Sequence, residues 1–207
     1  MFFEPSKGDH GLPHNPLKAC VVPRPIGWIS SYSSSGVANL APYSFFNLVS
    51  ERPAIVVYGS SGNTPYGPKD TVTNIGGTGD FVVNVATWDQ REAMHKSSAP
   101  LPPEQSEFGY AGLQTLPARL VKAPRVRGAP IHLECLHYRT LELPHDDPSG
   151  RNALVMGTVV GVHISDEVMT EGRVDVAKLR PIARLGYLEY AVIESAFGIG
   201  VRPSGTS

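Results

Sequence analysis

The chain has 207 residues, of which 41% are hydrophobic and 18% are charged, and its formal net charge is −1. This composition fits one globular domain over residues 1–207. The near-neutral charge excludes a strongly basic protein, so we expect neither nucleic acid nor an anionic membrane as a partner.

The N-terminal segment, MFFEPSKGDHGLPHNP, has no basic stretch followed by an apolar run and so lacks the pattern of a signal peptide. No apolar run in the chain approaches the roughly 20 residues that cross a membrane. Cys20 and Cys135 are too few for a disulfide framework and have no metal-binding spacing. We therefore expect a cytoplasmic protein.

Short apolar runs separated by Gly- and Pro-rich turns recur along the chain from residue 26 onward. The runs are IGWISSYS, AIVVY, DFVVNVA, IHLECLHY, ALVMGTVVGVHI and YLEYAVIES. Several are rich in β-branched residues and too short for helices, which indicates an antiparallel barrel or sandwich. Residues 131–136 alternate between two faces, as a half-buried strand does.

Helical patterns are few. We expect Asp70 to cap a short helix over residues 71–75 that stops at Gly76-Gly77. The stretch Trp88–Ser98 is the best candidate for a longer helix. The segment APLPPEQSEFGYAGLQTLP, residues 99–117, is Pro-rich and irregular. Its length is typical of a lid or a pocket wall, although a plain surface excursion also fits.

The common catalytic and metal-binding motifs are missing from this sequence. It contains no GxSxG, no HExxH and no CxxC. In HLECLH, strand alternation places His132 and Glu134 on one face and His137 on the other, which argues against a three-ligand metal site. NIGGTGD lacks the strand-then-helix order of a dinucleotide motif. We therefore predict neither a metal site nor a catalytic side chain.

The stretch NLAPYSFFN, Asn39–Asn47, mixes aromatic and amide side chains and contains a proline. Pro42 cannot donate to a β-ladder, so the run bends or lies at a sheet edge and leaves backbone groups free for a ligand. Aromatic groups suit a flat apolar ring, and the amide of Asn47 suits a ring edge with donors and acceptors. Phe45 and Phe46 also fit as plain core residues.

The stretch PKDT, residues 68–71, offers the groups that a phosphate needs. Lys69 carries a charge and three donors, Thr71 carries a hydroxyl, and a helix opening here would add free N–H groups. The same residues also describe an ordinary capped helix with a solvated lysine. A ring pocket near a phosphate site suggests FMN as the ligand.

Several motifs occur in one order: RPIGWISS, Gly36, NLAPYSFFN, KDT with Asn74-Ile75, and FVVN. In this order they resemble the flavin reductase-like, FMN-binding split-barrel family. The resemblance implies a core at about residues 12–193 and tails at residues 1–11 and 197–207. The later segments EFGYAGL, HLEC, GTVVGVHI and RPIARLGYLEY resemble its branch of nitrilotriacetate monooxygenase reductase components. The resemblance implies a mainly β fold, a Greek-key split β-barrel of about six antiparallel strands with a few short helices.

The resemblance also implies a homodimer with one FMN per subunit, near the dimer interface. Lys69 and Thr71 would reach the phosphate, and Arg184 and Gly186 would approach from the end of the chain. The implied cofactor-binding residues are Arg24, Pro25, Ser30, Ser31, Ala41, Pro42, Tyr43, Ser44, Phe45, Phe46, Asn47, Lys69, Thr71, Arg184 and Gly186.

The activity that the resemblance implies is hydride transfer from NAD(P)H to flavin, which needs no protein acid or nucleophile. Three functions stay open: a reductase that supplies a partner monooxygenase, a flavoenzyme that acts on a small organic substrate, and an FMN electron carrier. Small flavin reductases often carry GDH where this chain has Gly150-Arg151-Asn152, and Thr158 replaces a frequent glutamate. The histidine that helps to seat the nicotinamide is therefore absent, which counts against NAD(P)H as the physiological donor but not against flavin binding. His163 could face the pocket, but we expect it to be a buried, hydrogen-bonded strand residue.

Overall fold

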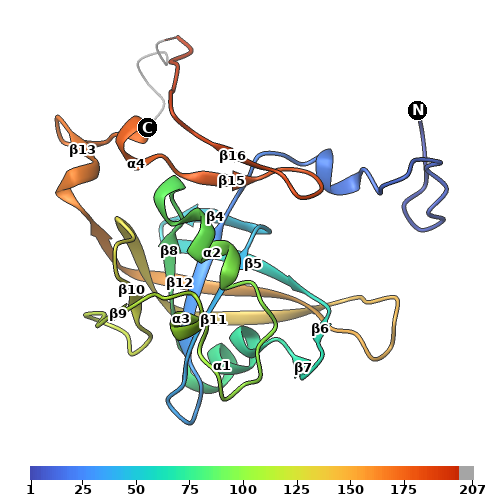
Figure 1. Cartoon of the computed structure of the whole chain (residues 1–207), viewed down its shortest axis with the longest axis horizontal. Coiled ribbons are helices and arrows are strands. Elements are labelled where there is room, and N and C mark those ends of the chain that lie inside the picture. Colours follow the sequence, from blue (N-terminus) through green and yellow to red (C-terminus); the bar gives the residue numbers. More distant parts are fainter. Residues whose placement is uncertain (201–207) are drawn as a thin grey trace.

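A computed structural model describes residues 1–200 of the chain, so most of the expected 197–207 tail lies outside the described residues. Its largest element is an antiparallel sheet of seven strands in the order β3-β2-β8-β11-β12-β5-β4 (Figure 1). These strands are β2 (Gly27–Tyr32), β3 (Ala38–Tyr43), β4 (Phe46–Glu51), β5 (Ala54–Ser61), β8 (Asp80–Val85), β11 (Ile131–Leu143) and β12 (Asn152–Ile164).

The two outermost strands of this sheet, β3 and β4, are consecutive in the chain. Only Ser44 and Phe45 separate them, so the sheet must curl until its edges approach. Beside this connection, the N–H of Gly59 on β5 donates to the carbonyl of Phe45 at 2.7 Å, which extends the pairing of β4 with β5. We call residues Tyr43–Phe46 the seam. Because Pro42 lies on an edge strand, its missing N–H breaks no interior ladder.

Two apolar cores lie on opposite faces of β2, because strand residues alternate between faces. Ile29 faces the barrel interior with Val56, Tyr58, Phe81, Cys135 and Val155. Trp28 faces outward and packs with Leu40, Met94, Phe108, Val126 and Ile182. The outer core therefore fixes the helices and the small second sheet against the barrel.

The helices are short. They are η1 (Leu17–Ala19), α1 (Asp70–Thr78), η2 (Trp88–Gln90), α2 (Arg91–Lys96), α3 (Glu107–Tyr110), η3 (Asp166–Val168) and α4 (Val176–Leu179). The predicted cap and end of α1 were wrong. Lys69 is the N-cap residue, without a side-chain cap, and the helix runs through Gly76 and Gly77 to end at Gly79, whose φ is 80°. The predicted helix over Trp88–Ser98 is confirmed as η2 followed by α2.

A small sheet covers one end of the barrel, with α2 between the two (Figure 1). It consists of β1 (Arg24–Pro25), β15 (Ile182–Arg184) and β16 (Tyr190–Val192). Three two-stranded ribbons complete the fold: β6 (Asn63–Thr64) with β7 (Gly67–Pro68), β9 (Thr115–Leu116) with β10 (Arg125–Val126), and β13 (Met169–Thr170) with β14 (Arg173–Val174). Segments distant in the sequence thus meet around α2.

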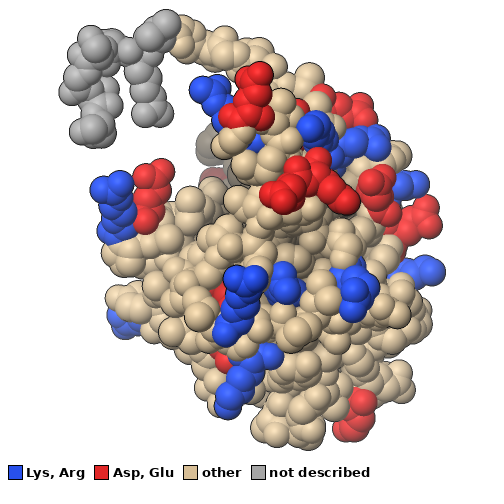
Figure 2. All heavy atoms as spheres, turned by 90° about the vertical axis from the view of Figure 1, so that its left-hand side faces the viewer, with Lys and Arg blue, Asp and Glu red and all other residues tan. Residues whose placement is uncertain are grey.

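The charged surface is mixed. On the face shown in Figure 2, Lys and Arg side chains lie scattered among uncharged residues, with Asp and Glu interspersed toward the top. Within residues 1–200 no helix is both long and apolar enough to span a membrane.

Candidate functional site

Two adjoining cavities meet at the seam. The larger, of about 1050 Å³, is lined by the seam, α2, β15 and β16. The smaller, of about 330 Å³, is lined by β3, the start of α1 and residues 97–101. Pro42, Tyr43, Lys69 and Ser98 line both cavities. Ligand pockets typically measure about 300–1,000 Å³, so the larger cavity has room for a cofactor and a second molecule.

The seam and the adjoining end of β3 supply flat apolar groups and edge backbone to this site. Pro42, Tyr43, Ser44 and Phe45 line the larger cavity, and Ala41 lines the smaller one. Burial raises the pKa of Tyr43 to about 12, and its hydroxyl has no hydrogen-bond partner within residues 1–200, although Thr71 and Ser60 lie near it. Because β3 pairs only with β2, half of its backbone groups point away from the sheet and are available to a ligand.

Lys69 places a positive charge where the two cavities join. Its side chain is half-buried and makes no hydrogen bond or ion pair with any residue in 1–200. Its ammonium lies 5.5 Å from the ring centroid of Tyr43. Burial lowers the pKa of Lys69, and the nearby charge of Lys18 lowers it further. A half-buried, unpaired ammonium requires an anionic ligand or solvent to compensate it.

The start of α1 adds a donor beside Lys69. The N–H groups of Val72 and Thr73 donate to the carbonyl of Lys69, while the N–H of Thr71 has no partner within the described chain. Such free N–H groups and the helix dipole favour an anion at this end. The Thr71 hydroxyl is already engaged, because it donates to Asn39 Oδ1 at 2.8 Å. A phosphate here would therefore meet the backbone of Thr71 and not its hydroxyl proton.

Glu107, which the sequence did not single out, anchors this polar cluster. One carboxylate oxygen accepts hydrogen bonds from Asn39 Nδ2 and from the N–H of Leu40, both at 3.0 Å. Burial raises the pKa of Glu107. Its α3 helix lies within the irregular segment at 99–117. Pro100 and Leu101 from the same segment line the smaller cavity, so this segment forms a wall of the site.

Arg24 connects the N-terminal segment to the small sheet, and Arg184 lies near it. Buried Arg24 donates to the carbonyls of Lys18, Val21 and Leu185 at 2.5, 2.8 and 2.9 Å. Burial lowers the pKa of Arg24, and the charge of Arg184 adds to this effect. Arg184 also lines the larger cavity, with its guanidinium carbon 4.5 Å from the ring centroid of Tyr190.

Six of the predicted cofactor-binding residues line neither cavity: Pro25, Ser30, Ser31, Phe46, Asn47 and Gly186. Ser30 is buried and donates to the carbonyl of Pro124 at 2.5 Å. Asn47 is exposed on β4. A Cβ on Gly186 would lie 2.5 Å from that of Ala19, so this glycine admits the N-terminal segment. Their contact with a cofactor stays a prediction.

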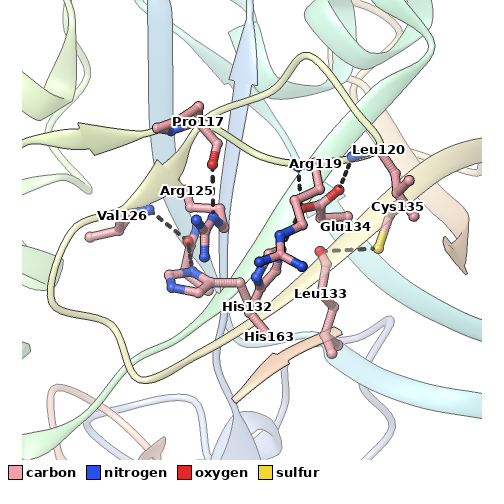
Figure 3. A network of polar contacts seen from close by, with 11 residues as sticks. Pro117, Arg119, Leu120, Arg125, Val126, His132, Leu133, Glu134, Cys135 and His163 are labelled. Carbon is pink, nitrogen blue, oxygen red and sulfur yellow. Dashed lines mark hydrogen bonds and ion pairs between the residues drawn. The ribbon is translucent and has the colours of Figure 1, made fainter. Parts of the chain in front are cut away.

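The polar cluster on β11 has a structural role (Figure 3). Glu134 is fully buried. Its carboxylate accepts hydrogen bonds from the N–H groups of Arg119 and Leu120 at 2.7 and 2.6 Å. It also contacts His163 Nε2 at 2.5 Å. Burial raises the pKa of Glu134, but these three partners outweigh it and leave the pKa lowered. His163 is a hydrogen-bonded strand residue, as predicted, but its side chain is 18% exposed and so is not fully buried. Residues 1–200 contain no group of three side chains suited to a metal ion.

Comparison with known proteins gives the family. The flavin reductase like domain model matches residues 19–183, so the chain belongs to this family. A protein of Halalkalibacterium halodurans is 36% identical over 184 residues, 88% of each chain. Nitrilotriacetate monooxygenase component B from Bacillus cereus superposes with a TM-score of 0.87 at 29% identity, over 96% of this chain and 98% of the other. Pseudomonas fluorescens 2-nitrobenzoate 2-nitroreductase NbaA gives 0.78 at 30% identity, over 92% and 91%.

The chain is thus a flavin reductase-like protein with a mainly β, split-barrel fold, as the sequence motifs predicted. Its main sheet has seven strands, one more than the approximate six that the resemblance implied.

Proposed function

We propose that this protein binds FMN in the larger cavity and acts as an FMN-dependent oxidoreductase that accepts hydride from NAD(P)H. The observation that carries the proposal is Lys69, an unpaired, half-buried cation beside the free N–H of Thr71 in a cavity of about 1050 Å³. This combination fits a phosphate attached to a large flat ring. Membership of the flavin reductase like family supports the choice of a flavin.

The chain's residues bind and orient the cofactor. Lys69 and the N-terminus of α1 would hold the phosphate, and Pro42, Tyr43, Ser44 and Phe45 would cover the ring system. Because its pKa is about 12, Tyr43 stays neutral at physiological pH and places no negative charge next to Lys69. When bound, FMN supplies the hydride-accepting chemistry. The cavity walls align the second ligand, since reacting atoms must approach to roughly 3–3.5 Å.

We also propose that the protein is a cytoplasmic homodimer with one FMN per subunit. Apolar residues exposed on and beside edge strand β4 support a self-association surface: Phe45, Leu48 and Val49 are 44%, 50% and 57% exposed. Exposed apolar sheet edges are usually covered in native assemblies. The similarity to a nitrilotriacetate monooxygenase component B supports a partner monooxygenase that receives the reduced flavin.

An anaerobic assay tests the proposal. Purified protein is mixed with FMN and either NADH or NADPH, and flavin absorbance is followed. Turnover of excess FMN is the expected result for a reductase that releases reduced flavin. Failure to bind FMN in a titration would overturn the whole proposal, whereas FMN binding without bleaching by either nucleotide would remove NAD(P)H and favour an electron carrier.

A second function is favoured by the 30% identity to a 2-nitrobenzoate 2-nitroreductase over 92% of this chain. In that case the protein would keep its FMN and act on a small organic substrate in the space left beside the ring. Bleaching confined to one bound flavin per subunit, with FMN retained through gel filtration, would distinguish this function from the first.

A further inference from the structure

The larger cavity carries more positive charge than one FMN phosphate neutralises. The cationic side chains that line it are Lys18, Arg24, Lys69, Arg91, Lys96 and Arg184, while Glu92 is the one carboxylate among its lining residues in 1–200. A phosphate monoester carries about −2 at neutral pH, so an excess of about three positive charges would remain after FMN bound.

Carboxylates elsewhere in the described chain do little to compensate these cations. Of the six, only Arg91 forms an ion pair within residues 1–200, at 3.3 Å from exposed Glu92. Exposed pairs of this kind are worth little. Asp70 and Glu107 line the smaller cavity and not this one. Two like-charged pairs, Arg24 with Arg184 and Lys69 with Lys18, are close enough to perturb each other.

Two of the cations, Arg91 and Lys96, lie on α2 and are not among the predicted cofactor-binding residues. Arg91 places its guanidinium carbon 4.1 Å from the ring centroid of Trp88, which also lines the cavity. Arg180 lies over the same ring at 5.6 Å, but its charge is shared with Asp89 and Glu194. Lys96, at the other end of α2, is exposed and has no ion-pair partner in residues 1–200.

We propose that the second ligand of this site, the molecule that exchanges electrons with the flavin, is an anion whose negative group is held by Arg91 and Lys96 of α2. This inference rests on the proposed function and names the substrate class of the same cavity. The negative group is a carboxylate or a phosphate, which bind arginine and lysine through the same charge-assisted hydrogen bonds. It belongs either to a dinucleotide donor or to an organic acid.

Trp88 provides a reporter for this surface. The chain has two tryptophans; Trp28 is fully buried, whereas Trp88 is 37% exposed and lines the cavity. Iodide should therefore quench the fluorescence of Trp88 and spare Trp28. We expect the iodide quenching constant to exceed that of caesium by at least about threefold at low salt, since a local positive potential concentrates anions. The iodide quenching constant should still exceed that of caesium when the protein is saturated with FMN.

Matched variants assign the effect to α2. Arg91→Gln/Lys96→Gln should lower the iodide quenching constant by about half or more, and Lys96→Gln, which leaves the contact between Arg91 and Trp88 intact, should lower it in part. Arg151→Gln removes one positive charge, as Lys96→Gln does, but outside the cavity, and should leave quenching unchanged. Equal quenching by iodide and caesium, or an iodide constant unaltered in the double variant, would overturn the inference.

Competition identifies the source of the anion. Benzoate represents an organic carboxylate and ADP represents the phosphates of a dinucleotide, with benzamide and adenosine as uncharged controls. The anion that protects Trp88 from iodide, while its control does not, identifies the class; protection by neither anion refutes the inference. A separate FMN titration reports on the proposed function, because quenching of the cofactor-free protein tests α2 whether or not FMN binds.

Discussion

Replacing Lys69 tests the phosphate site most directly. Lys69→Ala removes a half-buried ammonium that has no ion pair within residues 1–200, so the variant leaves no carboxylate stranded. The main loss is the contact with the ligand. Charge-assisted hydrogen bonds contribute about 1.5–3 kcal/mol, which corresponds to a rise in the Kd for FMN of about 10- to 150-fold.

Riboflavin, which lacks the phosphate, is the matched ligand for this experiment. Fluorescence titrations with FMN and riboflavin would be made on the wild type, Lys69→Ala and Lys122→Ala, an exposed lysine outside both cavities. Only FMN binding to Lys69→Ala should weaken. An equal loss of riboflavin affinity would show that Lys69 supports the ring pocket, and an unchanged FMN affinity would remove it from the site.

The pH dependence adds a second criterion. Burial and the charge of Lys18 lower the pKa of Lys69 from its ordinary 10.5, so it loses its proton at a lower pH than an exposed lysine does. FMN affinity should therefore fall as the pH rises through this lowered pKa. Lys69→Ala should not show the fall, because it has no proton to lose at this position.

Three further predictions concern stability and use urea unfolding. A Cβ on Gly27 would lie 2.6 Å from Phe46 Cδ2, so Gly27→Ala should destabilise the fold by about 1–3 kcal/mol. Gly77 has open space around it, so Gly77→Ala should not destabilise the fold. Equal effects of the two substitutions would contradict this prediction. Burial lowers the pKa of His132 from 6.5 to about 4, so its contribution is complete above pH 6.5 and falls by about 3 kcal/mol toward pH 4. His132→Gln should lack this part of the slope, and parallel pH profiles would refute it. Because the pKa of Glu134 is lowered in the fold, its ionised form stabilises the protein at pH values above its ordinary pKa of 4.5, and this stabilisation is lost as the pH falls through the folded pKa. Glu134→Gln should therefore lower the free energy of unfolding by about 3 kcal/mol at pH 7, and the gap between variant and wild type should shrink in acid.

The fold was predictable where the pattern is local. The run DFVVNVA forms β8, and residues 131–136 form the start of β11. The strand continues to Leu143 because pairing with β12 holds RTLEL in extended form, although its side chains give no clear alternation. The end of α1 was missed for a related reason. Gly76 and Gly77 face solvent and tolerate the helical conformation, so the helix ends only where Gly79 adopts a positive φ.

The site was predictable only in its local pieces. NLAPYSFFN and PKDT each contain groups suited to a ring and a phosphate, and the structure brings Tyr43 and Lys69 together. No local pattern indicates that Lys18 would lie near Lys69, because Arg24 holds that segment through carbonyls far apart in the chain. It also could not show that the Thr71 hydroxyl would be engaged by Asn39.

The fold is compatible with more than one reaction, and α2 carries the residues that we propose select the second ligand. A monooxygenase component B and a nitroreductase superpose on this chain at 29% and 30% identity, so one barrel accommodates differently named activities. In the site that we propose, the seam and Lys69 would contact FMN, which those activities would have in common. Arg91 and Lys96 lie in the same cavity but belong to a separate element. Since hydride transfer needs alignment and not a protein acid, the charge on this helix can select the second ligand without altering the chemistry.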